Sequence, residues 1–187
     1  MQSVRDTLRA STKALHDSLE QCLPISGDAV DVAVYRQHLS FLLGFHAPLE
    51  TRLANNDALR ARLPDLELRF KTALLTADLG ADSETADRAM ALPDCSTSAR
   101  ALGVLYVLEG ASRGAAVLLR RLLRDGIVPG PVGTSYLEGY GATQAAMWTT
   151  FCEALEAIPP DERDEARAGA IETFEAMSQS WHARTRV

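Results

Sequence analysis

From Ala99 to Leu123 the sequence reads ARALGVLYVLEGASRGAAVLLRRLL. The apolar spacing predicts one long α-helix, yet this helix would contain Gly103, Gly110 and Gly114. Glycine in a helix interior is about 1 kcal/mol less favourable than alanine, and spacings of seven and four place all three on one face. Such a bare stripe suits either a closely packed neighbouring helix or a flat, bulky ligand, and the spacing leaves both interpretations open.

Signals for helix ends bracket this stretch and a second helix at the start of the chain. Asp94–Ser98 offers several N-cap residues for the glycine helix, and Gly126 is a natural stop after its end. Ser3 and Asp6 resemble a capping box that opens a first helix, and Pro24 follows its end.

The rest of the chain shows helical periodicity, and no period-two strand pattern is convincing. A helix is expected from about Asp31, with Pro48 kinking or ending it. Further helices are expected over Asp57–Leu63, Leu66–Leu79, Thr143–Ala157 and Asp161–His182, and residues 126–141 are rich in loop residues. The sequence therefore predicts an all-α fold in a single domain that covers residues 1–187.

Composition and charge argue against several classes of protein. The 187 residues are 47% hydrophobic and 24% charged, as is ordinary for a soluble globular domain. The net charge of −6 and the lack of a free basic cluster argue against nucleic acid as the main partner. No run approaches the roughly 18 uncharged apolar residues of a membrane span. The N-terminal segment lacks the apolar core of a signal peptide, so we expect a cytoplasmic protein without a membrane partner.

Familiar catalytic and redox motifs are absent from the sequence. The three cysteines are odd in number and far apart, which argues against a disulfide framework and a cysteine-based zinc site: Cys22, Cys95 and Cys152. No GxSxG, HExxH, Walker or GxGxxG motif supports a hydrolase, a zinc protease, a P-loop or a Rossmann site.

His16 is the histidine with the most informative surroundings. It adjoins an apolar stripe on the first helix, and Glu20 follows one turn later on the same face; the stripe is Leu8, Thr12, Leu15, Leu19 and Leu23. A carboxylate there could hold the second ring nitrogen of a metal-bound imidazole. The plainer interpretation is a buried, satisfied histidine or a salt link. Arg9, two turns earlier, could receive a ligand carboxylate or be an ordinary exposed helix arginine.

Four stretches together resemble the heme oxygenase family. LRASTKALHDSLE (Leu8–Glu20) is similar to the proximal helix, in which a histidine binds heme iron. LYVLEGASRGAAVL (Leu105–Leu118) is similar to the distal helix of the bacterial enzymes. YRQHLSFLLGFHAPLETRL (Tyr35–Leu53) resembles the second helix, and YLEGYGATQAAMWTTF (Tyr136–Phe151) resembles the bacteriophytochrome-associated branch.

The resemblance implies a helical bundle in which heme lies between a proximal and a distal helix. His16 corresponds to the iron ligand and Glu20 to the acceptor behind it, while Thr12 lines that side. Arg9 corresponds to a residue that contacts a heme propionate. Gly110 and Gly114 correspond to the flexible distal glycines, whose bare backbone lets the helix approach the heme face and leaves room for dioxygen.

The sequence departs from the animal enzymes on the distal side. Ala111 stands where they carry an aspartate, so proton delivery would use water, Ser112 or another group. Arg113 is an unexpected cation that could point away from heme, reach a propionate or shape the distal side. The late-helix basic residues of the animal enzymes have no clear match, so Tyr136, Tyr140 or Arg9 could hold the propionates instead.

The reaction implied by the resemblance is cleavage of heme to biliverdin, carbon monoxide and ferrous iron. Heme would be both substrate and cofactor, O2 the oxidant, and a ferredoxin- or reductase-type protein the external electron donor. A bacteriophytochrome is a candidate recipient of the biliverdin. The alternatives are a heme carrier or sensor without turnover, a thiaminase-like or cofactor-synthesis relative without heme, and a helical interaction module without a ligand.

Overall fold

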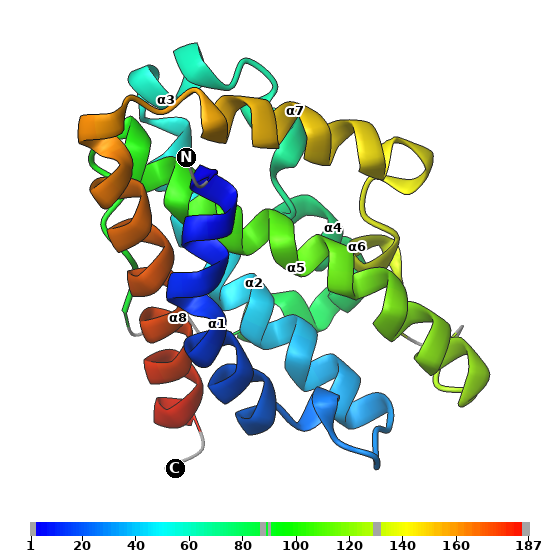
Figure 1. Cartoon of the computed structure of the whole chain (residues 1–187). Helices are drawn as coiled ribbons and strands as arrows, with labels where there is room; N and C mark the ends of the chain where they lie inside the picture. The colour runs from blue at the N-terminus through cyan, green and yellow to red at the C-terminus, as the bar shows by residue number, and fades with distance from the viewer. Residues whose placement is uncertain (1–2, 87–88, 90, 129–131, 185–187) are drawn as a thin grey trace.

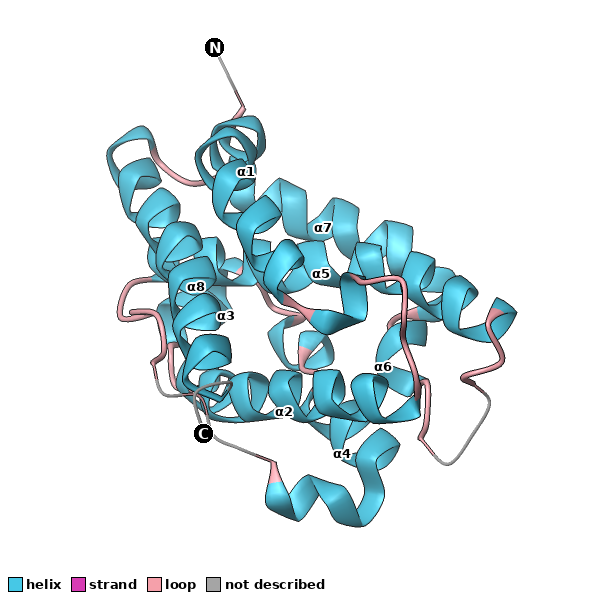
Figure 2. Ribbon diagram, turned by 90° about the horizontal axis from the view of Figure 1, so that it is seen from below, coloured by secondary structure: helices cyan, strands magenta, loops and turns pink. Residues whose placement is uncertain are grey.

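The computed structural model describes residues 3–86, 89, 91–128 and 132–184, and all regular elements within them are helical (Figures 1 and 2). The α-helices are α1 (Val4–Cys22), α2 (Val32–Ala54), α3 (Asp57–Arg62), α4 (Thr72–Leu79), α5 (Ser98–Arg124), α6 (Ser135–Glu138), α7 (Gln144–Glu156) and α8 (Arg163–Arg184). Short 3-10 turns are η1 (Pro24–Ser26), η2 (Leu66–Arg69), η3 (Gly80–Thr85), η4 (Gly141–Thr143) and η5 (Pro160–Glu162). The all-α prediction is confirmed.

Helix α5 runs through the middle of the molecule, and the other long helices surround it (Figure 1). Its main partner is α8, which also packs against α1. Helix α2 packs against α4, and the short α6 contacts both α4 and α5. The N-terminal half of α5 lies in the core, where Leu102 and Val104 are fully buried.

The predicted helix ends are confirmed by the capping contacts. The Ser3 side chain accepts a hydrogen bond from the Asp6 backbone N–H at the start of α1. The Thr97 hydroxyl accepts from the Arg100 backbone N–H at the start of α5. Gly126, just past the end of α5, has a φ of 71°, a left-handed conformation that glycine adopts without a steric penalty.

Helix α2 continues through Pro48 to Ala54, so the helix does not end at the proline. A proline has no N–H to donate to the carbonyl four residues earlier, here that of Gly44. The backbone N–H of Ala89 donates to that carbonyl instead, at 3.0 Å. A segment distant in sequence thus supplies the hydrogen bond that Pro48 removes.

The single helix expected over residues 66–79 is wrong, because η2 and α4 are separate elements. The break occurs where the backbone N–H groups of Lys71 and Thr72 donate to the buried carboxylate of Glu50, at 2.7 and 3.1 Å. His46 lies 2.9 Å from the same carboxylate. Glu50 on α2 therefore acts as the cap of α4. The sequence around residue 70 contains no pattern that predicts this cap.

Helix α5 is the one helix of the described chain that is long and apolar enough to span a membrane. That test uses length and composition only, and the core helix of a globular protein passes it as well. The buried share of its most apolar window is 53%, so packing inside the protein accounts for about half of that apolar stretch.

Candidate active site

The three glycines of α5 have different surroundings. A Cβ added to Gly103 would overlap the carbonyl oxygen of Ala166 on α8, and a Cβ on Gly169 of α8 would overlap the carbonyl of Arg100. Nothing lies within 4 Å of a Cβ added to Gly110 or Gly114. Helix packing therefore explains the first glycine, and open space borders the other two.

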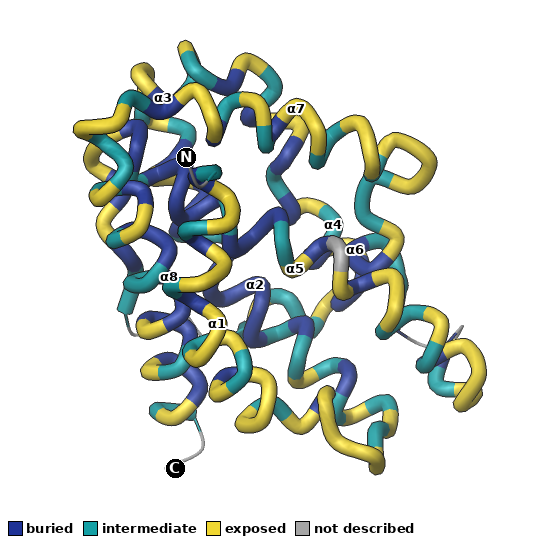
Figure 3. Tube along the Cα trace, viewed as in Figure 1, coloured by how far each residue is buried: buried dark blue, intermediate teal, exposed yellow. Residues whose placement is uncertain are grey.

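The open space borders an apolar surface along the second half of α5. Ala111 and Gly114 are exposed, and Val117 is 60% exposed although its side chain is large and apolar. Figure 3 shows the change from the buried first half of α5 to its more exposed end. We call these residues, Gly110, Ala111, Gly114 and Val117, the open face of α5.

Helices α1 and α5 approach each other one turn before this open face. Burial raises the pKa of the Tyr106 hydroxyl on α5, while Arg9 and a hydrogen bond with Thr12 of α1 act to lower it. Tyr106 is therefore a neighbour of these two α1 residues. His16 on α1 and Gly110 on α5 each lie about one turn, roughly 6 Å along the helix axis, from this contact.

His16 is exposed, and two carboxylates lie near one of its ring nitrogens. Its side chain is 57% exposed, and Nδ1 lies 3.7 Å from Glu20 Oε2 and 3.6 Å from Asp17 Oδ1. The ring meets Phe174 of α8 edge-on, with ring centroids 5.9 Å apart. Because both carboxylates lie on the Nδ1 side, Nε2 is the nitrogen available to a metal. Asp17 was not singled out by the sequence, although it lies as near as Glu20.

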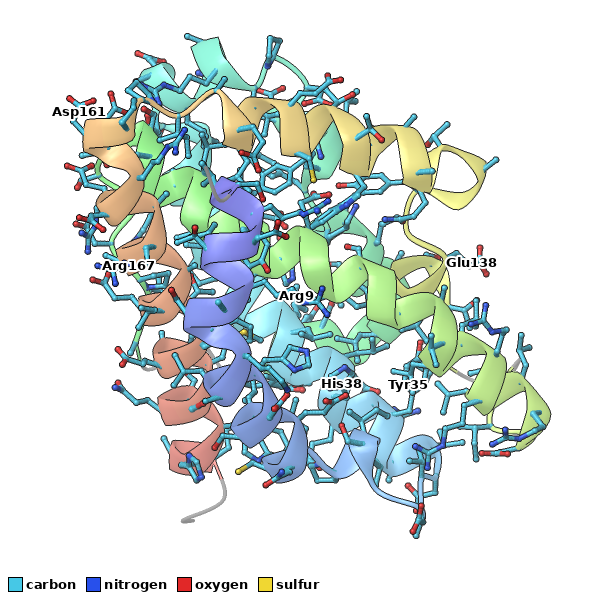
Figure 4. All side chains as sticks on the ribbon, in the orientation of Figure 1. Arg9, Tyr35, His38, Glu138, Asp161 and Arg167 are labelled. Atoms are coloured by element: carbon cyan, nitrogen blue, oxygen red, sulfur yellow. The ribbon has the colours of Figure 1, made fainter. Side chains whose placement is uncertain are left out.

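Arg9 and Thr12 occupy the same helix as His16 in different environments. Arg9 is exposed and lies on the side of α1 that faces α5 (Figure 4). Thr12 is buried, and its hydroxyl donates to the Leu8 carbonyl at 2.8 Å. Arg113 belongs to α5, but its side chain lies outside the described part of the structure.

The remaining residues selected from the sequence point into the protein interior. Ser112 is buried, and its hydroxyl donates to the Leu108 carbonyl of its own helix at 3.4 Å. Tyr136 is buried and packs edge-on against His46, with ring centroids 5.9 Å apart. The Tyr140 hydroxyl donates to Glu109 at 2.6 Å. These three side chains therefore have protein partners and do not belong to the open face of α5.

A buried charged cluster, which the sequence analysis missed, holds α5 just before Gly110. Glu109 accepts the Tyr140 hydrogen bond through Oε1, and its Oε2 lies 3.2 Å from Nη1 of the buried Arg69. The Lys71 ammonium lies 3.3 Å from the centre of the Tyr140 ring. Burial raises the pKa of Glu109 and lowers that of Lys71 to about 8. Glu109 in an otherwise apolar stretch was the one signal in the sequence for a buried charge. Its partners could not be predicted, because they come from distant segments of the chain.

An open depression lies beside the C-terminal end of α1. It is lined by Asp17, Glu20, Gln21, Cys22, Leu23, Pro24, Ser26 and Gly27. Glu20 and Asp17 face it, but neither His16 nor the glycines of α5 line it. This depression is therefore distinct from the open face of α5. No group of three or more histidine, cysteine or acidic side chains suited to a metal occurs in the described residues.

Both the sequence and the fold are similar to those of known proteins. The family model for heme oxygenase matches residues 2–182. The fold is similar to heme oxygenase from Neisseria meningitidis in its NO- and CO-bound structures, with a TM-score of 0.74, 22% identity and coverage of 100% of this chain and 94% of that one. It is also similar to heme oxygenase from Leptospira interrogans, with a TM-score of 0.77, 15% identity and coverage of 97% and 100%.

No curated protein sequence matches this chain significantly. The family match extends over almost the whole sequence and includes both α1 and α5, so it covers His16 as well as the open face. The two alternatives without heme, a cofactor-synthesis relative and a ligand-free module, find no support in it. The chain belongs to the heme oxygenase family and is a heme-degrading oxidoreductase.

Proposed function

We propose that this chain binds heme between His16 and the open face of α5 and cleaves it with O2 to biliverdin, carbon monoxide and ferrous iron. The observation that carries the assignment is the open space at Gly110 and Gly114, opposite in role to the tightly packed Gly103. Helix packing alone would leave the two later glycines, each about 1 kcal/mol unfavourable, without a reason.

The residues of this region fit a heme. His16 offers an exposed imidazole with carboxylates behind Nδ1, the arrangement expected of a metal-binding histidine. The exposed apolar Val117 and the bare backbone at Gly114 suit a flat aromatic ring system. Arg9 supplies a guanidinium for a propionate at the edge. When bound, heme supplies the oxygen chemistry through its own iron.

The protein residues orient heme and control what reaches its distal side. Ala111 is exposed and has no acidic side chain to offer, so we assign proton delivery to water reaching the open face. Ser112 could take part only if its hydroxyl left the Leu108 carbonyl. The Glu109 cluster holds α5 immediately before the open face and so would fix the position of that backbone against a bound heme.

The partners of the reaction are part of the proposal. O2 is the oxidant, and the electrons come from a ferredoxin- or reductase-type protein, because the sequence contains no recognisable flavin or iron–sulfur motif. The likeness of Tyr136–Phe151 to the phytochrome-associated branch favours delivery of biliverdin to a bacteriophytochrome. The cytoplasmic location stays a prediction.

The test is to mix the purified protein with hemin, record the absorption spectrum, add a reductant in air and identify the pigment. His16→Ala should lose the histidine-ligated spectrum together with biliverdin formation. His182→Ala removes a histidine at the far end of α8 and is the matched control, with an unchanged spectrum expected. A His16→Ala protein with the parental spectrum would move the iron to another histidine and reject this site.

A heme carrier or sensor is the second candidate, favoured by Ala111 at the position of the animal enzymes' aspartate. The same experiment separates the two functions. A carrier would show a stable ferrous heme spectrum in air with excess reductant, whereas an oxygenase would replace the heme band by that of biliverdin.

A further inference from the structure

His38 on α2 is a polar side chain that neither the fold nor the proposed reaction uses. The residue is partly buried, and its Nδ1 is buried without a hydrogen-bond partner among the described residues. Burial lowers the pKa of His38 to about 4, so the imidazole is neutral at pH 7. A shielded polar atom without a partner is unfavourable, and in a native structure it calls for an explanation.

Neighbouring contacts place His38 on the face of α2 that looks toward the proposed heme site. One turn further along α2, Phe41 meets Trp181 of α8 edge-on at 5.2 Å between ring centroids. One turn before His38, the Tyr35 hydroxyl donates to the carbonyl of Gly133, which lies just before α6 in the chain. At 100° per residue, His38 lies between these two directions, and so between α8 on one side and α6 on the other.

The same face of α8 contacts His16 of α1 and Phe41 of α2. Phe174, which meets the His16 ring, and Trp181, which meets Phe41, are seven residues apart and therefore lie on one face of α8. His16 of α1 and Phe41 of α2 therefore pack against the same face of α8, at points about 10 Å apart along its axis. In the projection of Figure 4, His38 is drawn to the right of the lower half of α1 and below α5, on the side of α1 from which Arg9 projects.

We propose that the His38 imidazole donates a hydrogen bond to one heme propionate, so that this carboxylate lies against α2 and not in solvent. The inference rests on the proposed function. Methyl and vinyl groups at a heme edge are apolar, and only the two propionates can pair with an imidazole N–H. Arg9, on α1, is available to the second propionate. Nδ1 has no hydrogen-bond partner among the described residues, so no protein group competes with the propionate for a proton carried on Nδ1.

The chemical probe is a pair of porphyrins, hemin and hemin dimethyl ester, in which both carboxylates are capped. Dissociation constants are measured by absorbance titration without reductant, so no turnover is required. His38→Leu should weaken hemin binding about tenfold or more, as expected for loss of a charge-assisted hydrogen bond, and should leave the affinity for the ester unchanged. His38→Gln retains a donor and should keep most of the affinity.

Gln37→Leu is the matched control, since Gln37 is exposed on the same helix and should not affect either porphyrin. The melting temperature of apo His38→Leu should equal or exceed that of the parent, because the variant loses a polar atom without a partner. Equal weakening toward both porphyrins, or none, would overturn the propionate contact. Loss of the histidine-ligated spectrum in His38→Leu would make His38 the iron ligand and also overturn it. A parent that binds no hemin would instead reject the proposed function.

Discussion

The first and second halves of α5 carry glycines on one helical face, but the neighbours of these glycines differ. At Gly103 the backbone of α8 fills the space that a side chain would need. At Gly169 of α8, in the same way, the Arg100 carbonyl of α5 fills that space. At Gly110 and Gly114 that space is open, and the surrounding surface is apolar and exposed. Between the halves, Glu109 joins α5 to a buried charged cluster.

This difference shows that one sequence pattern can serve two physical purposes within one helix. The packed half gives α5 a fixed crossing with α8, and under the proposed function the open half would present bare backbone to heme. The packed half is expected to control stability, whereas the open half is expected to control chemistry. Four measurements test that division.

The largest effect is expected at the packed crossing. Gly103→Ala would force its Cβ into the Ala166 carbonyl and separate two core helices, with a loss of about 3 kcal/mol or more in the free energy of unfolding. Thermal or urea unfolding of the apo-protein measures it. Gly169→Ala, on the facing helix, should behave alike. A parental stability in both variants would show that the crossing is loose.

A smaller loss in the free energy of unfolding is expected at Glu109, between the two halves of α5. Glu109→Ala removes one of the two carboxylates that act on the buried Lys71 and leaves Glu50 as the other. It also leaves Arg69 with Asp65 as its remaining partner. Breaking a buried charge pair from one side destabilises proteins by about 3 kcal/mol, and the retained Asp65 should reduce this to about 2 kcal/mol. Urea unfolding of the apo-protein gives the number. Tyr140→Phe, which removes only a hydroxyl, should lose about 1 kcal/mol.

The open half should respond in the opposite way. Gly110→Ala and Gly114→Ala should leave the apo-protein as stable as the parent or up to about 1 kcal/mol more stable, because alanine favours a helix. Biliverdin formation should slow roughly tenfold or yield a different isomer, because the new methyl group occupies space above heme. Apo melting temperature and pigment yield are measured on the same samples. A destabilised apo-protein with normal turnover would reverse the assignment of the two halves.

The last effect concerns the pH dependence of stability and His38 of α2. His38 has a folded pKa of about 4 against an ordinary value of 6.5, so between these values the unfolded chain binds the proton more readily. Native stability should therefore fall as pH decreases from 6.5 to 4, by about 1–2 kcal/mol for this partly buried group. Apo unfolding as a function of pH checks this. His38→Leu should lose less stability over the same interval, and an identical pH profile would contradict the assignment.

Much of the fold could be predicted because it depends on neighbours in the chain. Ser3 caps α1 and Thr97 caps α5 through hydrogen bonds that span three residues, and Gly126 terminates α5 by its own backbone freedom. The position of His16 with Glu20 is likewise a matter of helical spacing. The family resemblance then assigned the roles of these residues, which periodicity alone left open between a metal ligand and a salt link.

Tertiary structure decided what depends on distant segments. The Gly44 carbonyl, which receives no hydrogen bond from Pro48, accepts one from Ala89. Residues 66–79 divide into two elements where the Lys71 backbone N–H donates to Glu50. Gly103 and Gly110 are the same residue on the same face, and only the location of α8 separates a packing glycine from one that borders open space. Spacing along a helix determines the side of the helix on which a residue lies. What packs against that side depends on contacts between residues far apart in the chain.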